Sequence, residues 1–375
     1  MKVAVIFGTR PEGIKMAPLV KQLKEDADMD CVFINTAQHR EMLDQVLELF
    51  SIQPDYDLNI MKKGQTVEGI TSDIILNLSS ILESEMPDLV LVHGDTTTTF
   101  AASYASFLKK IPVGHVEAGL RTYQHYSPFP EELNRQLVSR LATYHFAVTE
   151  RNKENLLQEN IREDHITVVG NTVIDALLDV STRKYHYPEP IRSIVQDDKK
   201  IILLTTHRRE NIEQLSDVFD AINLILLNNR NTQVVFPVHK NPVIREKVDA
   251  AFTCNERVHL IEPLDYESFV HVMKASYLII TDSGGIQEEA PALGKPVLVA
   301  RDTTERPEGV EAGTLKLVGT VTNRIVEECD RLINSTDEYE KMKKITNPYG
   351  DGHTAEKIID YIKARFHIPV KVESL

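Results

Sequence analysis

Short apolar runs rich in β-branched residues alternate along this chain with polar segments of helical periodicity, and this alternation restricts the possible folds more than any other feature. Continuous apolar runs bounded by Gly, Pro and polar residues are typical of strands buried on both faces. Helices are predicted between them, for example at residues 17–24, 40–50 and 132–141. Alternating strands and helices imply parallel sheets joined by right-handed crossovers. The predicted strands are residues 3–7, 32–35, 89–93, 113–117, 145–148, 201–205, 234–238, 258–261, 278–281, 297–300 and 315–318.

A chain of 375 residues is too long for one small core, so two domains are expected. The predicted fold class is α/β, with two Rossmann-like, doubly wound parallel-sheet domains and an interdomain cleft. We expect one domain at residues 1–170, a second at 171–355, and a C-terminal helix and tail at 356–375 that packs back on the first domain. Residues 170–172 are a candidate hinge, and residues 182–199, rich in Pro, Tyr and charge, are expected to form a surface connection. Ligands of such sheets bind beyond the carboxyl ends of the strands.

The formal net charge of −14 argues against a nucleic-acid-binding surface. It also makes local groups of cations informative, and these occur at Arg10 and Lys15, at residues 207–209, and at Arg301 and Arg306. The three cysteines are widely spaced and form no Cys/His cluster, which indicates neither a metal site nor a disulfide framework. The apolar N-terminal run is too short for a signal peptide, and no stretch approaches the roughly 20 apolar residues of a membrane helix. We therefore expect a cytoplasmic protein with no membrane partner.

The first predicted strand ends in a loop that carries two cations, Arg10 and Lys15. Gly8 permits a tight turn there, but the loop lacks the GxGxxG fingerprint of dinucleotide-binding proteins. Cations beside the backbone N–H groups of a helix N-terminus can bind a diphosphate. Taken alone, the loop is explained equally well as an ordinary strand-to-helix turn with surface cations.

A second loop, residues 281–290, also follows a predicted strand. Its Ser-Gly-Gly segment, residues 283–285, can bring backbone amides close to a phosphate. Glu288 and Glu289 are expected in the first turn of the following helix, where carboxylates are favoured. Either carboxylate can cap the helix or accept hydrogen bonds from ribose hydroxyls. Both loops together favour a nucleotide diphosphate as the ligand.

Acidic residues follow several predicted strands of the first domain. Asp95 and Glu117 lie at strand ends, and Glu131 begins a helix shortly afterwards, while His207 ends the first strand of the second half. A single acid in such a place is more often a helix cap than a catalyst. Three acids from one domain, facing cations across a cleft, indicate acid/base chemistry. We expect their crowding to raise the pKa of one carboxylate, which would supply an acid near neutral pH.

Taken together, these segments resemble the bacterial non-hydrolysing UDP-N-acetylglucosamine 2-epimerases. The resemblance implies a glycosyltransferase-B-like fold, no metal or nicotinamide cofactor, and a homodimer. The implied reaction interconverts UDP-N-acetylglucosamine and UDP-N-acetylmannosamine for cell-surface polysaccharides. It rests on residues 7–11, 92–99, 114–121, 130–135, 206–211, 281–291 and 301–307, which occur in the family's order and spacing.

The same resemblance implies roles for individual residues, with UDP bound by the second domain. Glu289 would bind the ribose, and Phe269 would line the uracil pocket. Leu264 stands where some relatives have Gln, so backbone groups would have to contact uracil there. The implied catalytic residues are Asp95, Glu117, Glu131 and His207, and the implied substrate contacts are Arg10, Lys15, Asp95, Glu117, His207, Phe269, Ser283, Gly284, Gly285, Glu289 and Arg306.

Many bacterial members of this family are activated by UDP-N-acetylglucosamine at a second site beside the first. Gln38, His39 and Glu41 resemble part of that site. Glu41 and Gly64, however, stand where some relatives have Gln and Arg. Loss of a cation that faces a diphosphate weakens such a site, so the resemblance leaves allosteric activation open.

The implied reaction needs a base and an acid on opposite faces of the sugar ring. The hydrogen at C2 is not next to a carbonyl group, so its direct removal is prohibitively uphill. We expect anti elimination of UDP to 2-acetamidoglucal, followed by re-addition of UDP after a proton reaches the opposite face of C2. Which carboxylate serves which face stays open. A hydrolysing epimerase, a UDP-sugar glycosyltransferase and a non-catalytic sugar-nucleotide sensor are the alternatives.

Overall fold

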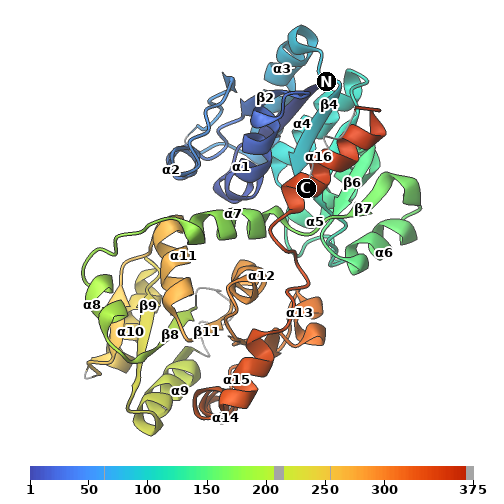
Figure 1. Ribbon diagram of the computed structural model, residues 1–375. Helices are drawn as coiled ribbons and strands as arrows, with labels where there is room; N and C mark the ends of the chain where they lie inside the picture. Colours follow the sequence, from blue (N-terminus) through green and yellow to red (C-terminus); the bar gives the residue numbers. More distant parts are fainter. Residues whose placement is uncertain (63, 207–214, 254, 369–375) are drawn as a thin grey trace. The chain divides into compact units, whose positions relative to one another are not determined.

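The computed structural model describes residues 1–62, 64–206, 215–253 and 255–368. The chain divides into two units (Figure 1). Unit 1 comprises Met1–Ala176 together with the chain from Tyr349 onward, and unit 2 comprises Leu177–Pro348. Helix α7 (Thr172–Thr182) carries the chain out of unit 1.

Unit 1 is built on a seven-stranded sheet in the order β3-β2-β1-β4-β5-β6-β7, and all of its strand pairs are parallel. The order reverses between β1 and β4, so the loops that follow these two strands turn to opposite sides of the sheet. Such a switch point is where doubly wound sheets bind ligands. The strands are β1 (Lys2–Phe7), β2 (Asp30–Asn35), β3 (Tyr56–Asp57), β4 (Leu89–His93), β5 (Val113–Ala118), β6 (Tyr144–Ala147) and β7 (Ile166–Val168).

Helices cover the sheet of unit 1. Helix α4 packs against both α3 and α5, and the apolar side chains of these helices form one core with β1, β2, β4 and β5. The C-terminal helix α16 packs against α1, where Lys363 pairs with Asp26 at 2.5 Å. Its Tyr361 ring meets Phe146 of β6 edge to face. The helices are α1 (Arg10–Glu25), α2 (Glu41–Leu49), α3 (Val67–Glu85), α4 (Thr97–Leu108), α5 (Glu131–Leu141), α6 (Glu150–Gln158), the 3₁₀ helix η1 (Glu163–His165) and α16 (Thr354–Arg365).

Unit 2 repeats the plan with a six-stranded parallel sheet in the order β10-β9-β8-β11-β12-β13. Its switch point lies between β8 and β11. One face is covered by α9, α10 and α14, and the other by α8, α11 and α12. The strands are β8 (Lys200–Thr205), β9 (Thr232–Pro237), β10 (Val258–Ile261), β11 (Leu278–Thr281), β12 (Val297–Val299) and β13 (Leu315–Leu317). The helices are α8 (Ile191–Gln196), α9 (Leu215–Asn228), α10 (Pro242–Phe252), α11 (Tyr266–Ala275), α12 (Gly284–Ala292), α13 (Pro307–Ala312), α14 (Thr322–Asn334) and α15 (Thr336–Lys343).

The predicted class of two doubly wound parallel sheets is confirmed, and every predicted strand is present. Two short strands at the edges of the first sheet, β3 and β7, were not predicted, because two or three residues are too few to show periodicity. The prediction of a surface connection at residues 182–199 is wrong in part. Helix α8 lies within that stretch, and Ile191 and Ile194 are buried in a core of unit 2.

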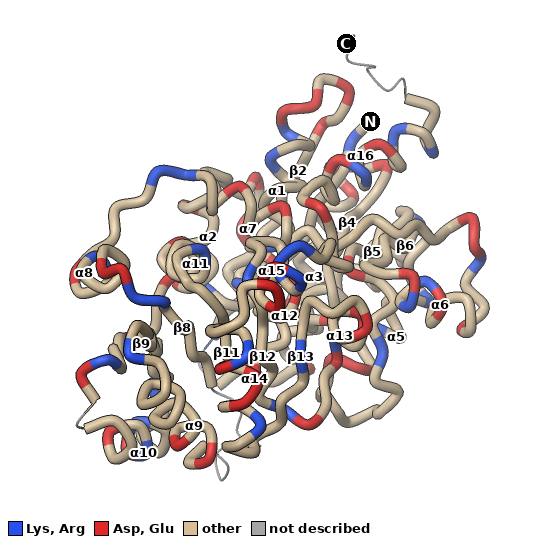
Figure 2. Tube along the Cα trace, turned by 60° about the horizontal axis from the view of Figure 1, so that its bottom comes forward, with Lys and Arg blue, Asp and Glu red and all other residues tan. Residues whose placement is uncertain are grey.

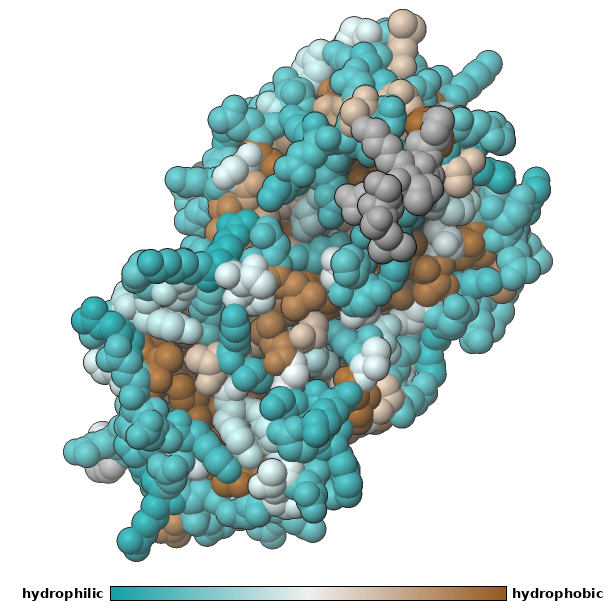
Figure 3. Space-filling model, in the orientation of Figure 1, coloured by the Kyte–Doolittle hydropathy of each residue, from teal (hydrophilic) through white to brown (hydrophobic). Residues whose placement is uncertain are grey.

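Charged residues of both signs are interspersed along the chain (Figure 2). On the face seen in Figure 3, hydrophilic residues predominate and apolar residues form patches between them. None of the described helices is both long enough and apolar enough to span a membrane. Among the described residues, no group of three or more His, Cys, Asp or Glu side chains is arranged to hold a metal ion.

Candidate functional site

The β1–α1 loop lies at the switch point of unit 1, and Gly8 begins it. A methyl group at position 8 would lie 1.8 Å from Thr36 Oγ1 and 3.2 Å from Gln38 N, so any side chain would overlap Thr36 and crowd the backbone after β2. Arg10 is the first residue of α1, and its neighbour Thr9 is the N-cap. No other described residue forms a hydrogen bond or ion pair with the Arg10 side chain, which leaves its guanidinium available to an anion at the helix N-terminus.

Glu12 joins the two loops of this switch point and is only 1% exposed. Its Oε2 accepts the backbone N–H groups of Gly8 at 3.1 Å and Thr9 at 2.8 Å. Its Oε1 accepts the hydroxyl of Thr96, the N-cap of α4, at 2.6 Å. Sequence reasoning missed Glu12, although Thr9 and Glu12 form a T-x-x-E capping box that could have indicated it. The carboxylate therefore fixes the loop after β1 to the loop after β4.

Glu117 is the centre of the acid/base candidates in unit 1. It lies at a β-bulge where the β5–β6 register shifts, and its φ of 61° is rare for a residue with a side chain. Such a conformation costs about 1–3 kcal/mol and persists only where its surroundings hold it. Lys15 Nζ pairs with its Oε2, Asn171 Nδ2 donates to the same oxygen at 2.9 Å, and His93 Nε2 lies 3.6 Å away. The bulge and these partners determine the direction of the Glu117 side chain at the end of β5.

The charge state of Glu117 is determined by burial and by the cations beside it. Burial alone would raise its pKa, but the positive charge of Lys15 and the nearby His93 hold the pKa well below its usual value. The predicted raised pKa concerned one unspecified carboxylate of the group, and Glu117 is not that carboxylate. Its immediate neighbours are cationic or neutral donors rather than other carboxylates. Glu117 is ionised at neutral pH and can accept a proton.

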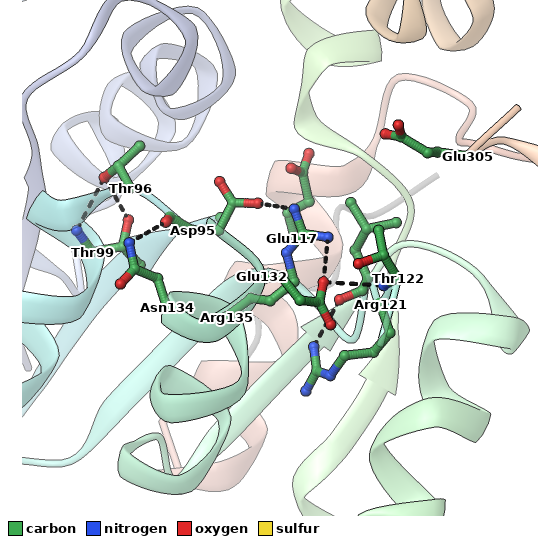
Figure 4. A network of polar contacts seen from close by, with 12 residues as sticks. Asp95, Thr96, Thr99, Glu117, Arg121, Thr122, Glu132, Asn134, Arg135 and Glu305 are labelled. Carbon is green, nitrogen blue, oxygen red and sulfur yellow. Dashed lines mark hydrogen bonds and ion pairs between the residues drawn. The ribbon is translucent and has the colours of Figure 1, made fainter. Parts of the chain in front are cut away.

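Asp95 follows β4 and has a cation of its own. Figure 4 shows that Arg135 of α5 lies between the carboxylates of Asp95 and Glu132. Asn134 Nδ2 donates to the Asp95 carbonyl oxygen at 2.9 Å, so two consecutive residues of α5 hold the loop. Arg135 Nη1 lies 3.2 Å from Glu132 Oε2. Helix α5 of the same unit thereby orients the Asp95 carboxylate.

Glu131 and Glu132 begin α5, and the structure separates their roles. Glu132 is 0% exposed and accepts the backbone N–H groups of Thr122 and Tyr123, each at 3.0 Å. Those bonds, with Gln136 and Arg135 as further partners, make it a structural residue. Glu131 is half-buried at the first position of the helix. The catalytic role of Glu131 stays a prediction.

The segment proposed for allosteric activation adjoins the β1–α1 loop. His39 N donates to Gly8 O at 2.9 Å, and Gln38 Oε1 accepts the Thr98 hydroxyl at 2.9 Å. Glu41 begins α2 and is exposed. Gln38 and His39 therefore lie beside the same loop as Arg10.

The loop after β11 lies at the switch point of unit 2. The hydroxyls of Thr205 and Thr281, at the ends of β8 and β11, are 2.6 Å apart, and the Ser283 N–H donates to Thr281 Oγ1 at 3.0 Å. Helix α12 begins at Gly284, so its first N–H groups are at the loop. A methyl group at Gly285 would meet nothing within 4 Å, which leaves open space beside the backbone. This combination suits a phosphate.

The expectation that Glu288 and Glu289 occupy the first turn of this helix is wrong. Helix α12 begins at Gly284, and its first turn contains no acidic residue. Both glutamates are buried, and Glu288 pairs with Arg306 while its carbonyl oxygen accepts from Asn347 at 2.8 Å. Glu288 therefore positions Arg306, a predicted substrate contact, rather than capping the helix.

Two further predicted contacts belong to unit 2. Phe269, in α11, is half-buried and packs against the core formed by α8, α11 and α12, as does Leu264 just before that helix. His207 lies outside the described residues. Three residues that contact the predicted groups were not predicted as site residues, namely His93, Arg135 and Asn171. Glu12, which binds the loops beside these groups, was not predicted either. Apart from the capping box at Glu12, their partners are distant in sequence, so no local pattern could have indicated them.

Comparison with known proteins identifies the family of this chain. The sequence model of the family described as UDP-N-acetylglucosamine 2-epimerase matches residues 21–363. A UDP-N-acetylglucosamine 2-epimerase of Bacillus subtilis is 55% identical over 361 residues, which are 96% of this chain and 94% of that protein. One from Escherichia coli K12 is 53% identical over 371 residues, 97% of this chain and 98% of that protein. The crystal structure of a Neisseria meningitidis UDP-GlcNAc 2-epimerase bound to UDP-GlcNAc matches with a TM-score of 0.84 and 50% identity, covering 97% and 100% of the two chains. This chain belongs to the UDP-N-acetylglucosamine 2-epimerase family.

Proposed function

We propose that this protein interconverts UDP-N-acetylglucosamine and UDP-N-acetylmannosamine without net hydrolysis, and that the product supplies precursors of cell-surface polysaccharides. The observation that carries the proposal is the buried, ionised Glu117, which pairs with Lys15 at the end of β5. Asp95 follows the neighbouring strand, β4. The relatives named as 2-epimerases, one of them bound to UDP-GlcNAc, support the substrate.

The proposed reaction is an anti elimination followed by its reverse on the other face. A carboxylate removes the C2 proton while the bond from C1 to the UDP oxygen breaks, so that 2-acetamidoglucal and UDP form. A second carboxylic acid then delivers a proton to the opposite face of C2 as UDP adds back to C1. Asp95, Glu117 and Glu131 supply these groups, and the ionised Glu117 is suited to accept a proton.

Each unit contains groups that can stabilise the negative charge that develops on the departing UDP. Unit 1 offers Arg10 at the N-terminus of α1 and Lys15 in its second turn, and unit 2 offers the N–H groups at residues 283–285. Lys15 pairs with Glu117 in this structure. A diphosphate that engages Lys15 would weaken that pairing, raise the pKa of Glu117 and make the carboxylate a stronger base.

The decisive experiment follows C2 of UDP-N-acetylglucosamine by NMR in deuterated water. We expect UDP-N-acetylmannosamine to form and deuterium to appear at C2 of both sugars. Free N-acetylmannosamine together with UDP would instead show a hydrolysing enzyme. Turnover with no exchange at C2, or no reaction at all, would exclude this mechanism and favour a transferase or a sensor.

The role of the carboxylate is tested by Glu117→Gln. This variant removes the proton acceptor while keeping a side chain of the same size, so we expect turnover to fall by about 100-fold or more with UDP binding retained. Calorimetric titration with UDP checks the binding. Wild-type turnover in the variant would remove Glu117 from the catalytic groups.

We also propose that the protein acts as a homodimer through the outer face of α3 and α4. These two helices pack against each other and expose Leu76, Phe107 and Leu108, which are 70%, 55% and 53% exposed. Covering such side chains on a second copy would remove apolar surface from water. Light scattering should give the dimer mass for the wild type and the monomer mass for Phe107→Glu, and a monomeric wild type would contradict the proposal.

A further inference from the structure

The donors around the Glu117 carboxylate converge on one of its two oxygens. Lys15 Nζ pairs with Oε2, Asn171 Nδ2 donates to the same atom at 2.9 Å, and His93 Nε2 lies 3.6 Å from it. The other oxygen, Oε1, faces Gly94, where an added methyl group would approach it to 3.7 Å. Within the described part of the chain no donor binds Oε1, so this is the oxygen open to a substrate proton.

Asn171 is anchored by its own backbone and side chain and is only 2% exposed. Its backbone N–H donates to Tyr349 O at 2.7 Å, and its Oδ1 accepts the Val173 N–H at 3.0 Å near the start of α7. Because Oδ1 already accepts a backbone hydrogen, the amide nitrogen is the atom that faces Glu117. The orientation of the amide is thus determined by its contacts.

These contacts lie where the chain passes between its units. The chain leaves unit 1 in α7, just after Asn171, and returns at Tyr349, whose carbonyl oxygen binds Asn171. A methyl group at Gly170 would lie 3.1 Å from Gly350 Cα, so the two crossing segments are closely packed. A change in the direction of either crossing would therefore act on Asn171 and, through it, on Glu117.

We infer that Asn171 is a positioning residue: by binding Oε2 it aims Oε1 of Glu117 at the substrate, and it couples this aim to the two chain crossings. The inference rests on the proposed function of Glu117. It predicts that the hydrogen-bond donor of Asn171 matters more than its volume. Aspartate is the informative replacement, because it keeps the size and can still accept the Val173 N–H, but it sets a carboxylate against Glu117.

The test compares Asn171→Asp with Asp175→Ala as the matched control. Asp175 Oδ1 accepts the Ala355 N–H at 2.8 Å, so its removal loosens the same junction without touching Glu117. Rates of C2 deuterium exchange and of epimerisation are measured from about pH 3.5 to 9, because the pKa of Glu117 lies below its ordinary value. Thermal unfolding of both variants is the check on folding.

For Asn171→Asp we expect kcat to fall by about 100-fold with little change in KM, as for a misplaced reacting group. The acid limb of its pH profile should move up by about one pH unit, because a second carboxylate disfavours ionisation of Glu117. Asp175→Ala should lose thermal stability and keep the acid limb in place. An Asn171→Asp variant with wild-type kcat and acid limb would overturn the inference, as would an equal displacement of the limb in Asp175→Ala.

Failure of the proposed function can be distinguished from failure of this inference. If the wild type does not turn over UDP-N-acetylglucosamine, the function fails while the link between Asn171 and Glu117 can still be measured. A ¹³C NMR titration of labelled glutamates, with the Glu117 signal assigned from Glu117→Gln, reports that link directly. A titration of Glu117 that Asn171→Asp leaves unchanged would then overturn the positioning role.

Discussion

Replacing Lys15 by methionine tests the electrostatics on which the proposed base depends. Methionine keeps an unbranched apolar stem and removes the charge that pairs with Glu117, while both side chains are mostly buried, at 18% and 11% exposed. Asn171 and His93 stay beside the carboxylate. In the variant a buried carboxylate therefore loses its cation but keeps a hydrogen bond.

The expected loss in the free energy of unfolding depends on the donors that remain beside Glu117. Removing one partner of a buried ion pair costs about 3–5 kcal/mol, and the remaining donors place Lys15→Met at the lower end, about 3 kcal/mol near pH 8. For a unit of this size that is roughly 6–12 °C in Tm. In the wild type the lowered pKa of Glu117 contributes stability above the unfolded pKa, which is lost as pH falls through the folded pKa. In the variant burial dominates and the folded pKa lies above the unfolded one, so stability is lost as pH rises.

The assay is urea unfolding of both proteins at about pH 5 and about pH 8. We expect the difference between wild type and Lys15→Met to be larger at the higher pH. Lys24→Met is the control on the same helix, because Lys24 pairs with Asp55 at 3.0 Å with side chains 34% and 43% exposed. Its cost should be below about 1 kcal/mol. A Lys15→Met penalty that is independent of pH, or no greater than that of Lys24→Met, would refute the reasoning.

Three further outcomes are expected. Glu131→Gln should abolish C2 exchange and keep UDP binding. Glu132→Gln should mainly lower Tm, because Glu132 accepts two backbone N–H groups in the core. Equal effects of the two variants would contradict the separation of their roles. Gly8→Ala should cost about 1–3 kcal/mol in urea unfolding, because its methyl group would overlap Thr36 Oγ1, and unchanged stability would show that the loop can move aside. Burial raises the pKa of the Cys31 thiol to about 12. A folded variant with Cys31 as its sole cysteine should therefore react with a disulfide reagent far more slowly at pH 8 than the same chain in urea. Equal rates would show that the thiol is accessible.

Much of the architecture could be predicted from the sequence, because buried parallel strands have a strong local signal. The apolar runs at residues 89–93, 201–205 and 278–281 are strands within one residue of their predicted bounds. The edge strands β3 and β7 carry no such signal, since they are two and three residues long. Helix α8 was missed because its buried residues, Ile191 and Ile194, are too few to establish a helical period over six residues.

The sequence by itself determined which residue types follow the strands, and hence the candidates Arg10, Asp95, Glu117 and Ser283. This is possible because the carboxyl ends of parallel strands meet at one edge of a sheet, so that local order predicts a common location. The sequence could not determine how those side chains pair. Lys15 and Glu117 are 102 residues apart, and Asn171 lies 54 residues beyond Glu117.

Only the tertiary structure decided these pairings, because they depend on strand order, on the β-bulge that turns Glu117, and on the path of the chain between units. The charge state of the carboxylate follows from them. The sequence predicted a raised pKa for one of the crowded acids without assigning it, and the structure shows that a lysine placed by the first helix of the unit lowers the pKa of Glu117. Electrostatic energies depend on distances of a few ångströms, and in a folded chain those distances are set by packing between segments that are remote in sequence.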